Sequence, residues 1–287
     1  MVSVGLTPWY PLKVVKRVIP SSGEHLPIVG LGTWQTFDVG ESDQARMPLK
    51  GVLSALAELG GTVVDSSPMY GRSEKVVGDL SRELGLTKNI FGATKVWTQG
   101  EHEGVSQMNK SSQKMAQSPM DLMQVHNLVD WKTHLKTLFK WKEQGKVRYI
   151  GITHYQESAY TRMIDIIKNY PIDFVQVNYS LISRTSGAMV LPLARDLGKA
   201  VIINRPYEGG TLFRQVQGKP LPSWAKDFDC NSWAAYFLKY ILANTAVTCA
   251  IPGTSKENHL RENLGASLGR LPNSDQQKQM VDYFNRL

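Results

Sequence analysis

The strongest constraint on the fold is a regular alternation of short apolar stretches with longer amphipathic segments. Eight stretches rich in β-branched and apolar residues follow one another at 28–33, 62–67, 90–96, 121–127, 147–153, 174–180, 200–206 and 248–254. Most of them begin roughly 30 residues apart, which is the length of one βα unit. The longer last interval leaves room for a long loop at 207–229. The pattern predicts eight buried strands, each followed by a helix.

The segments between these stretches have the spacing of amphipathic helices. In 48–60, five apolar side chains share one face, and glycines close the segment. Similar stripes lie in 73–84, 131–145, 158–170 and 232–244. Segment 101–117 has few apolar positions, so it predicts a helix more weakly.

Eight βα units predict an α/β fold with a parallel sheet covered by helices. Eight strands close a (β/α)8 TIM barrel, and a chain of 287 residues has the length of one such barrel. A doubly wound open sheet is the alternative. We expect 1–287 to form a single domain with a loose tail at 1–12, and a β-hairpin at 12–27 that closes the barrel floor.

Composition limits the class of protein. The hydrophobic content of 42%, the charged content of 20% and the mean hydropathy of −0.26 are those of a soluble globular protein. No segment approaches the roughly 20 apolar residues of a membrane span. The N-terminus lacks both a basic leader and a continuous apolar segment, which argues against a secretory signal and predicts a cytoplasmic location.

Charge and cysteine content narrow the choice further. The net charge of +8 comes from scattered Lys and Arg, without a basic run or a recognition motif, so we do not expect nucleic-acid binding. Cys230 and Cys249 stand alone, without a CxxC or a Cys/His cluster. A disulfide framework and a structural zinc site are therefore not predicted.

Three neighbouring strands each end in a polar group. Asp65, Lys95 and His126 end the second, third and fourth strands, and Tyr70 follows in the loop after Asp65. The active sites of barrels lie at this end of the strands. A buried Asp and a buried Lys on adjacent strands compensate each other's charge. Each of these residues alone is more often a helix cap, a solvated lysine or a core histidine. Their grouping at one rim favours a catalytic role.

The four groups suit the protonation of a carbonyl oxygen. A phenol is too weak an acid to release its proton readily, but an adjacent ammonium favours the phenolate and lowers the pKa. The carboxylate holds the ammonium, and the imidazole hydrogen-bonds the substrate oxygen. Such a set serves an oxygen that gains negative charge as hydride reaches its carbon. Gly71 and Ser73, just after Tyr70, are predicted to form a turn and a helix cap.

An ordered set of motifs resembles the aldo-keto reductase family. These motifs are GLGTW at 30–34, VVDSSPMYGRSE at 63–74, ATKVW at 93–97, DLMQVHN at 121–127, KVRYIGIT at 146–153 and IPGTSKENHLRENL at 251–264. The likeness extends from about residue 16 to residue 287. It implies an NAD(P)H-dependent carbonyl reductase in which Tyr70 is the proton donor, Lys95 and Asp65 tune and position it, and His126 orients the carbonyl.

The same resemblance implies a nicotinamide dinucleotide held without a Rossmann domain, NADPH rather than the alternative NADH. Loop hydroxyls and amides ahead of a helix N-terminus suit its 2′-phosphate. The cofactor contacts that the resemblance implies are Gly32, Thr33, Thr153, His154, Gln176, Asn204, Arg205, Thr254, Ser255, Lys256 and Asn263.

Aromatic and flexible side chains near the rim predict the substrate pocket, formed by Trp34, Met69, Trp97 and Tyr207. We expect small or aromatic aldehydes and ketones as substrates. Some members of the family are cofactor-binding, redox-sensing partners of ion channels with little turnover, and this is the alternative function. A metal-dependent barrel hydrolase needs an HxH motif near the first strand, which is absent, so no metal site is predicted.

Overall fold

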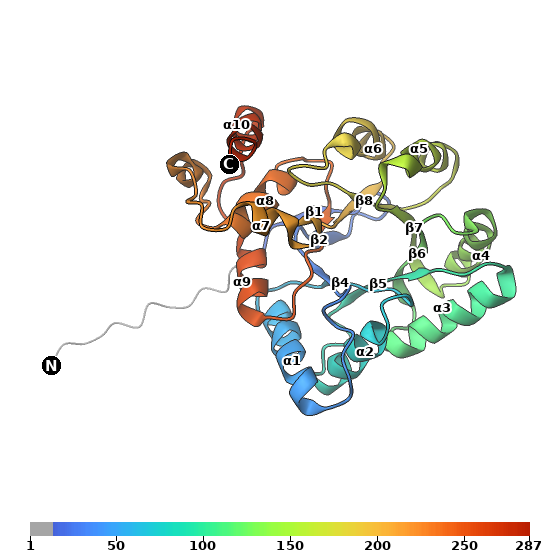
Figure 1. Ribbon diagram of the computed structural model, residues 1–287. Helices are drawn as coiled ribbons and strands as arrows, with labels where there is room; N and C mark the ends of the chain where they lie inside the picture. Colours follow the sequence, from blue (N-terminus) through green and yellow to red (C-terminus); the bar gives the residue numbers. More distant parts are fainter. Residues whose placement is uncertain (1–13) are drawn as a thin grey trace.

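The computed structural model describes residues 14–287 as a ring of parallel strands surrounded by helices (Figure 1). The strands of the ring are β3 Leu31–Gly32, β4 Val63–Asp65, β5 Phe91–Val96, β6 Met120–His126, β7 Val147–His154, β8 Phe174–Asn178, β9 Ala200–Asn204 and β10 Cys249–Ala250. Each falls within, or within one residue of, a predicted stretch. The predicted tail at 1–12 lies outside the described residues.

The ring is closed between its first and last strands. Each strand from β3 to β10 pairs in parallel with its neighbour in chain order. Parallel bridges then join Val29 to Ala250 and Gly32 to Gly253. The join is tight, because a Cβ on Gly32 would lie 2.7 Å from the carbonyl oxygen of Ile251. The barrel prediction is confirmed, and the alternative of an open, doubly wound sheet is wrong.

Helices cover the outer face of the ring. They are α1 Asp43–Glu58, α2 Ser73–Glu83, α3 Glu101–Met115, α4 Trp131–Glu143, α5 Tyr160–Asn169, α6 Thr185–Asp196, α8 Trp233–Leu242, α9 Glu257–Gly265 and α10 Ser274–Phe284. The predicted long loop at 207–229 contains η2 Glu208–Gly210, the short helix α7 Thr211–Gln215 and η3 Ser223–Phe228. A single turn, η1 Glu157–Ala159, precedes α5. No helix within residues 14–287 is long and apolar enough to cross a membrane.

Helix α3 forms although its sequence signal is weak. Gly104, Met108, Ser111 and Met115 are buried along one face. Their spacing of three and four residues is that of a helix stripe, but two of the four are small. Small residues here allow close packing, since a Cβ on Gly78 of α2 would lie 1.8 Å from the carbonyl oxygen of Lys114. Helix α3 is therefore held by close packing of its backbone against α2 rather than by a stripe of large apolar side chains.

The predicted hairpin covers the floor of the barrel. Strands β1 Lys16–Val18 and β2 His25–Pro27 pair antiparallel. Ile19 and Leu26 are buried among apolar side chains that the strands direct into the ring. The hydroxyl of Tyr149 on β7 donates to Glu24 in the hairpin turn at 2.7 Å. The hairpin prediction is confirmed.

Candidate active site

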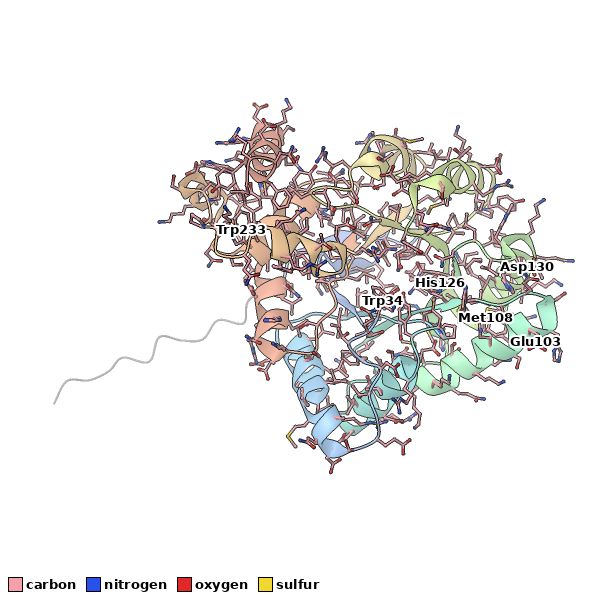
Figure 2. All side chains as sticks on the ribbon, viewed as in Figure 1. Trp34, Glu103, Met108, His126, Asp130 and Trp233 are labelled. Carbon is pink, nitrogen blue, oxygen red and sulfur yellow. The ribbon has the colours of Figure 1, made fainter. Side chains whose placement is uncertain are left out.

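Buried polar side chains gather inside the ring at the C-terminal ends of its strands. They are Asp65, Lys95, Gln124, His126, Thr153 and Gln176. The register of the parallel strands sets Lys95 beside Gln124, His126 beside Thr153, and Thr153 beside Gln176. In Figure 2, Trp34 and His126 lie inside the ring of helices, whereas Glu103 lies at its edge. The polar groups therefore face one another across the upper end of the barrel.

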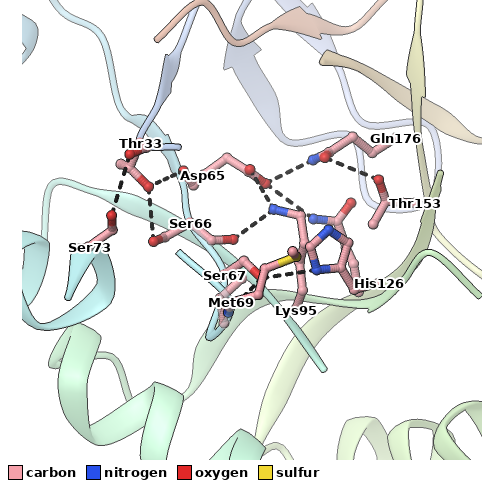
Figure 3. A network of polar contacts seen from close by, with 12 residues as sticks. Thr33, Asp65, Ser66, Ser67, Met69, Ser73, Lys95, His126, Thr153 and Gln176 are labelled. Atoms are coloured by element: carbon pink, nitrogen blue, oxygen red, sulfur yellow. Dashed lines mark hydrogen bonds and ion pairs between the residues drawn. The ribbon is translucent and has the colours of Figure 1, made fainter. Parts of the chain in front are cut away.

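The centre of this cluster is an ion pair. Nζ of Lys95 donates to Oδ2 of Asp65 at 2.6 Å and to the carbonyl oxygen of Ser66 at 2.7 Å (Figure 3). The other oxygen of Asp65 accepts from the amide nitrogens of Gln176 at 2.8 Å and Gln124 at 3.3 Å. Both charged side chains are almost completely buried. Each charge is thus compensated by its partner, and neutral donors hold the carboxylate.

Tyr70 lies directly above the ion pair. Its ring centroid is 5.1 Å from Nζ of Lys95. Burial alone would lower the pKa of Lys95, but the charges of Asp65 and Tyr70 outweigh it and raise the pKa above its ordinary value. Burial raises the pKa of Tyr70, and Lys95 only partly opposes this effect. The structure brings the three side chains together, but the expected net lowering of the phenol pKa is wrong, because desolvation exceeds the effect of the ammonium.

His126 is buried beside Tyr70 and is held from behind. Its Nδ1 lies 3.0 Å from Oγ of Ser67 (Figure 3). Its ring packs edge-on against Tyr70 at a centroid distance of 6.0 Å. Burial, together with the charges of Lys95 and His154, lowers the pKa of His126 to about 2. The imidazole is therefore neutral at physiological pH.

The turn after Tyr70 differs from the prediction in one respect. Gly71 has a φ of +60° and forms the expected turn. The N-cap of α2 is Arg72, whereas Ser73 lies inside the helix and donates its hydroxyl to the carbonyl oxygen of Thr33 at 3.4 Å. Asp38 accepts the backbone N–H of Arg72 at 3.0 Å. The cap prediction for Ser73 is wrong, because a carboxylate from another loop satisfies the helix end.

A cleft of about 510 Å³ opens above these residues. Most of the predicted site residues line it: Gly32, Thr33, Trp34, Asp65, Met69, Tyr70, His126, Thr153, Gln176, Asn204, Arg205 and Tyr207. Lys95 is fully buried below the cleft. Trp34 and Met69 are about two-fifths exposed, at 42% and 39%, so both stay accessible at its edge.

The other predicted residues lie outside the lining of the cleft. The ring of Trp97 is 6.4 Å from that of His126. His154 stacks on Tyr155 at a centroid distance of 5.8 Å, and its Nδ1 accepts the backbone N–H of Gln156. Tyr155 lines the cleft in its place. The assignments of Trp97 and His154 stay predictions.

The loop before α9 begins at the cleft and leads away from it. Gly253 lines the cleft, and Thr254, Ser255 and Lys256 follow it as the chain enters α9. Oγ1 of Thr254 accepts the backbone N–H of Lys256 at 3.1 Å. Asn263 on α9 accepts the hydroxyl of Tyr207 at 2.6 Å. The predicted phosphate and adenine contacts are therefore continuous with the cleft through Gly253 and Tyr207.

Arg205 crosses the mouth of the cleft. It has a positive φ of +49°. Its guanidinium lies over the rings of both Trp34 and Tyr155, at 5.9 and 5.6 Å from their centroids. Its Nε also lies 4.0 Å from Oε2 of Glu208, so cation–π contacts and an ion pair together hold the charged side chain. Arg205 thus joins loops that follow β3, β7 and β9.

Among the site residues that were not predicted, three hold or contact predicted ones. Gln124 holds Asp65, Ser67 contacts His126, and Tyr155 supports Arg205. Gln124 stands two positions before His126 in one strand, so strand alternation indicates that it shares the inner face. No comparable signal marks Ser67, in the turn after Asp65, or Tyr155, because irregular loops have no fixed period.

Comparisons with known proteins identify the relatives of this chain. Residues 28–285 match the model of the Aldo/keto reductase family. The chain is 27% identical over 280 residues to the aldo-keto reductase str7 of Strobilurus tenacellus, covering 84% of this chain and 81% of that protein. It is 26% identical over 256 residues to the methylglyoxal reductase YeaE of Escherichia coli K12, covering 86% and 88%.

Solved structures show the same fold. An aldo-keto reductase from Klebsiella pneumoniae in complex with NADPH superposes with a TM-score of 0.79 at 21% identity, covering 94% of this chain and 96% of that one. One from Bacillus halodurans superposes with a TM-score of 0.74, also at 21% identity and with the same coverage. The chain belongs to the aldo/keto reductase family, and is therefore an oxidoreductase.

Proposed function

We propose that the protein is an NADPH-dependent carbonyl reductase that converts aldehydes or ketones to alcohols, with Tyr70 as the proton donor. One observation carries the proposal. Tyr70 lines the cleft, while its ring lies 5.1 Å from Nζ of Lys95, which is itself paired with Asp65. In this order the phenol can donate a proton, the ammonium stabilises the phenolate that remains, and the carboxylate balances the charge of the ammonium.

The residues of the cleft fit a nicotinamide dinucleotide. Asn204 and Thr36 line the cleft, and each has a buried side-chain oxygen without a hydrogen-bond partner in residues 14–287. A bound amide or ribose hydroxyl satisfies such groups. Thr153 and Gln176 would hold the nicotinamide end. Lys256, at the N-terminus of α9, would hold the 2′-phosphate, which favours NADPH over NADH. The bound cofactor supplies the hydride.

The side chains of the site account for the proton. The raised pKa keeps Tyr70 protonated at neutral pH, so it has a proton to donate as the carbonyl oxygen gains charge. Lys95 stabilises the phenolate that remains. Asp65 keeps Lys95 protonated and fixed. His126, being neutral, hydrogen-bonds the same oxygen without a competing positive charge.

The cleft also favours a class of substrate. Trp34, Tyr155, Phe213 and Met69 supply large apolar surfaces around the reacting groups. Such walls suit small or aromatic aldehydes and ketones. One relative, YeaE of E. coli, is named a methylglyoxal reductase. Methylglyoxal therefore belongs in a substrate panel beside aromatic aldehydes.

The proposal is tested by NADPH consumption with a reactive aldehyde. Tyr70→Phe removes only the phenolic hydroxyl group and keeps the ring, and we expect kcat to fall by about 10² to 10⁴. Tyr283→Phe is a matched control, because that hydroxyl donates to the carbonyl oxygen of Pro220 and neither residue lines the cleft. Full turnover by Tyr70→Phe would overturn the assignment. Cofactor binding without turnover in the wild type would support the alternative, a redox-sensing module.

A further inference from the structure

Ser67 lies behind His126, on the side away from the cleft. Its side chain is fully buried in the turn that follows β4. Its Oγ is 3.0 Å from Nδ1 of His126 (Figure 3). His126 lines the cleft. The contact with Ser67 is the one hydrogen bond of the His126 ring within residues 14–287, so Nε2 has no partner there. The two nitrogens thus have different neighbours, Nδ1 the serine and Nε2 the cleft.

The hydrogen bonds around Ser67 indicate the direction of the contact. The backbone N–H of Met69 donates to Oγ of Ser67 at 3.4 Å. This oxygen is therefore an acceptor for Met69, and its own proton is left for His126, the nearest acceptor described for it. A neutral imidazole carries one proton on one nitrogen. When Nδ1 accepts from Ser67, that proton is on Nε2.

The opposite tautomer leaves two groups without suitable partners. If Nδ1 carries the proton and donates to Ser67, the serine proton has no acceptor within the described chain. A buried hydroxyl without a partner costs about 1 to 3 kcal/mol. Nε2 is then an acceptor facing the cleft, and it repels a carbonyl oxygen instead of binding it.

We propose that Ser67 is a positioning residue that fixes the tautomer of His126, so that its Nε2–H faces the cleft as a hydrogen-bond donor to the substrate oxygen. The effect of Ser67 on turnover rests on the proposed reductase function. The tautomer itself does not, because it follows from the contacts of Ser67 and is present without substrate.

The tautomer is measured directly in the unmodified protein. Long-range ¹⁵N–¹H correlation spectra of ¹⁵N-histidine-labelled wild type, near neutral pH and without cofactor, distinguish protonated from unprotonated ring nitrogens. His126→Gln identifies the signals of His126 by their disappearance. We expect a proton on Nε2 and none on Nδ1. A proton on Nδ1 would overturn the proposal, whatever the enzyme's activity.

Variants of Ser67 test the causal step. Ser67→Ala should leave His126 as a mixture of tautomers and lower kcat about tenfold, the effect of one hydrogen bond, with little change in NADPH affinity. Ser67→Thr retains a hydroxyl and should restore the wild-type tautomer. Ser267→Ala is the matched control, because it removes another buried serine hydroxyl, one bonded to the carbonyl oxygen of Leu264.

The outcomes separate the two proposals. If Ser67→Ala keeps the wild-type tautomer and the wild-type kcat, Ser67 is not a positioning residue. If the wild type has the Nε2–H tautomer, and Ser67→Ala loses it, but no aldehyde is reduced, the reductase function fails while the role of Ser67 stands. If aldehydes are reduced but the proton of His126 is on Nδ1, the reductase function stands and the role of Ser67 fails.

Discussion

The lower and upper halves of the barrel interior come from the same strands but contain opposite kinds of side chain. The lower half is an apolar cluster of the strand residues Val63, Phe91, Ala93, Leu122, Tyr149, Phe174, Ala200, Ile202 and Cys249, together with Ile19 and Leu26 of the hairpin and Ile251, which also reaches the cleft. The upper half holds Asp65, Lys95, Gln124, His126, Thr153 and Gln176. Both halves are buried, so burial alone does not decide which kind of side chain a position accepts.

The change from apolar to polar side chains takes place between neighbouring inward-facing positions of one strand. Asp65 lies two positions after Val63, and Lys95 lies two positions after Ala93, so both members of each pair point into the ring, at different heights. The lower layer is stabilised by apolar burial. The upper layer is tolerated only because each charge has a partner within hydrogen-bond distance. A substitution in the lower half therefore acts through the apolar surface that it buries. A substitution in the upper half must leave no charge without a partner.

Breaking the balance at the rim should have the largest effect. Lys95→Met leaves the carboxylate of Asp65 buried without a counterion, and we expect a loss of about 3 to 5 kcal/mol in the free energy of unfolding. Urea denaturation measures it. The double variant Asp65→Asn with Lys95→Met should recover most of this stability but no turnover. A single variant as stable as the wild type would show that the pair is not buried as described.

A floor substitution should lower stability without lowering turnover. Leu122→Ala empties space in the apolar cluster on the same strand as His126. We expect a loss of about 2 to 5 kcal/mol in the free energy of unfolding from lost burial and the cavity. In folded protein, kcat should stay within about twofold, since Leu122 does not itself line the cleft. A large fall in kcat at temperatures where the variant is fully folded would contradict the separation of the two halves.

The smallest effect should be on the pH dependence of stability. His126 is neutral in the fold because its pKa is lowered to about 2, whereas the unfolded chain binds a proton near the ordinary value. The contribution of His126 to the free energy of unfolding is complete above the ordinary pKa of about 6.5. It falls as the pH is lowered, by up to about 1.4 kcal/mol per pH unit. His126→Gln should remove this part of the dependence of the free energy of unfolding on pH. Urea denaturation between about pH 6.5 and 4.5 measures it, and the same dependence in the variant and the wild type would refute the prediction.

The strands and most helices were predictable because they repeat a simple period. The predicted second strand at 62–67 contains β4, and the helix at 73–84 matches α2 to within a residue. The weak signal for α3 has a physical cause, since close backbone packing against Gly78 replaces large apolar side chains. The sequence therefore predicts elements well where stability comes from apolar stripes, and less well where it comes from backbone proximity.

The candidate site was predictable where it lies on strands. Asp65, Lys95 and His126 occupy the expected rim. The positive φ of Arg205 and its contacts with Trp34 and Tyr155 depend on loops that meet only in the folded chain. The direction of the Tyr70 pKa shift likewise depends on how deeply the ring is buried, and sequence spacing carries no measure of that depth.

The join that closes the ring also has a thermodynamic consequence. Gly32 from one end of the sheet and Ile251 and Gly253 from the other all line the cleft. A molecule seated there touches the first and last βα units at once. Its binding free energy is therefore added to the cost of separating them, because only the closed ring presents both walls. Occupancy of the cleft and integrity of the ring form a single linked equilibrium between segments more than two hundred residues apart in the chain.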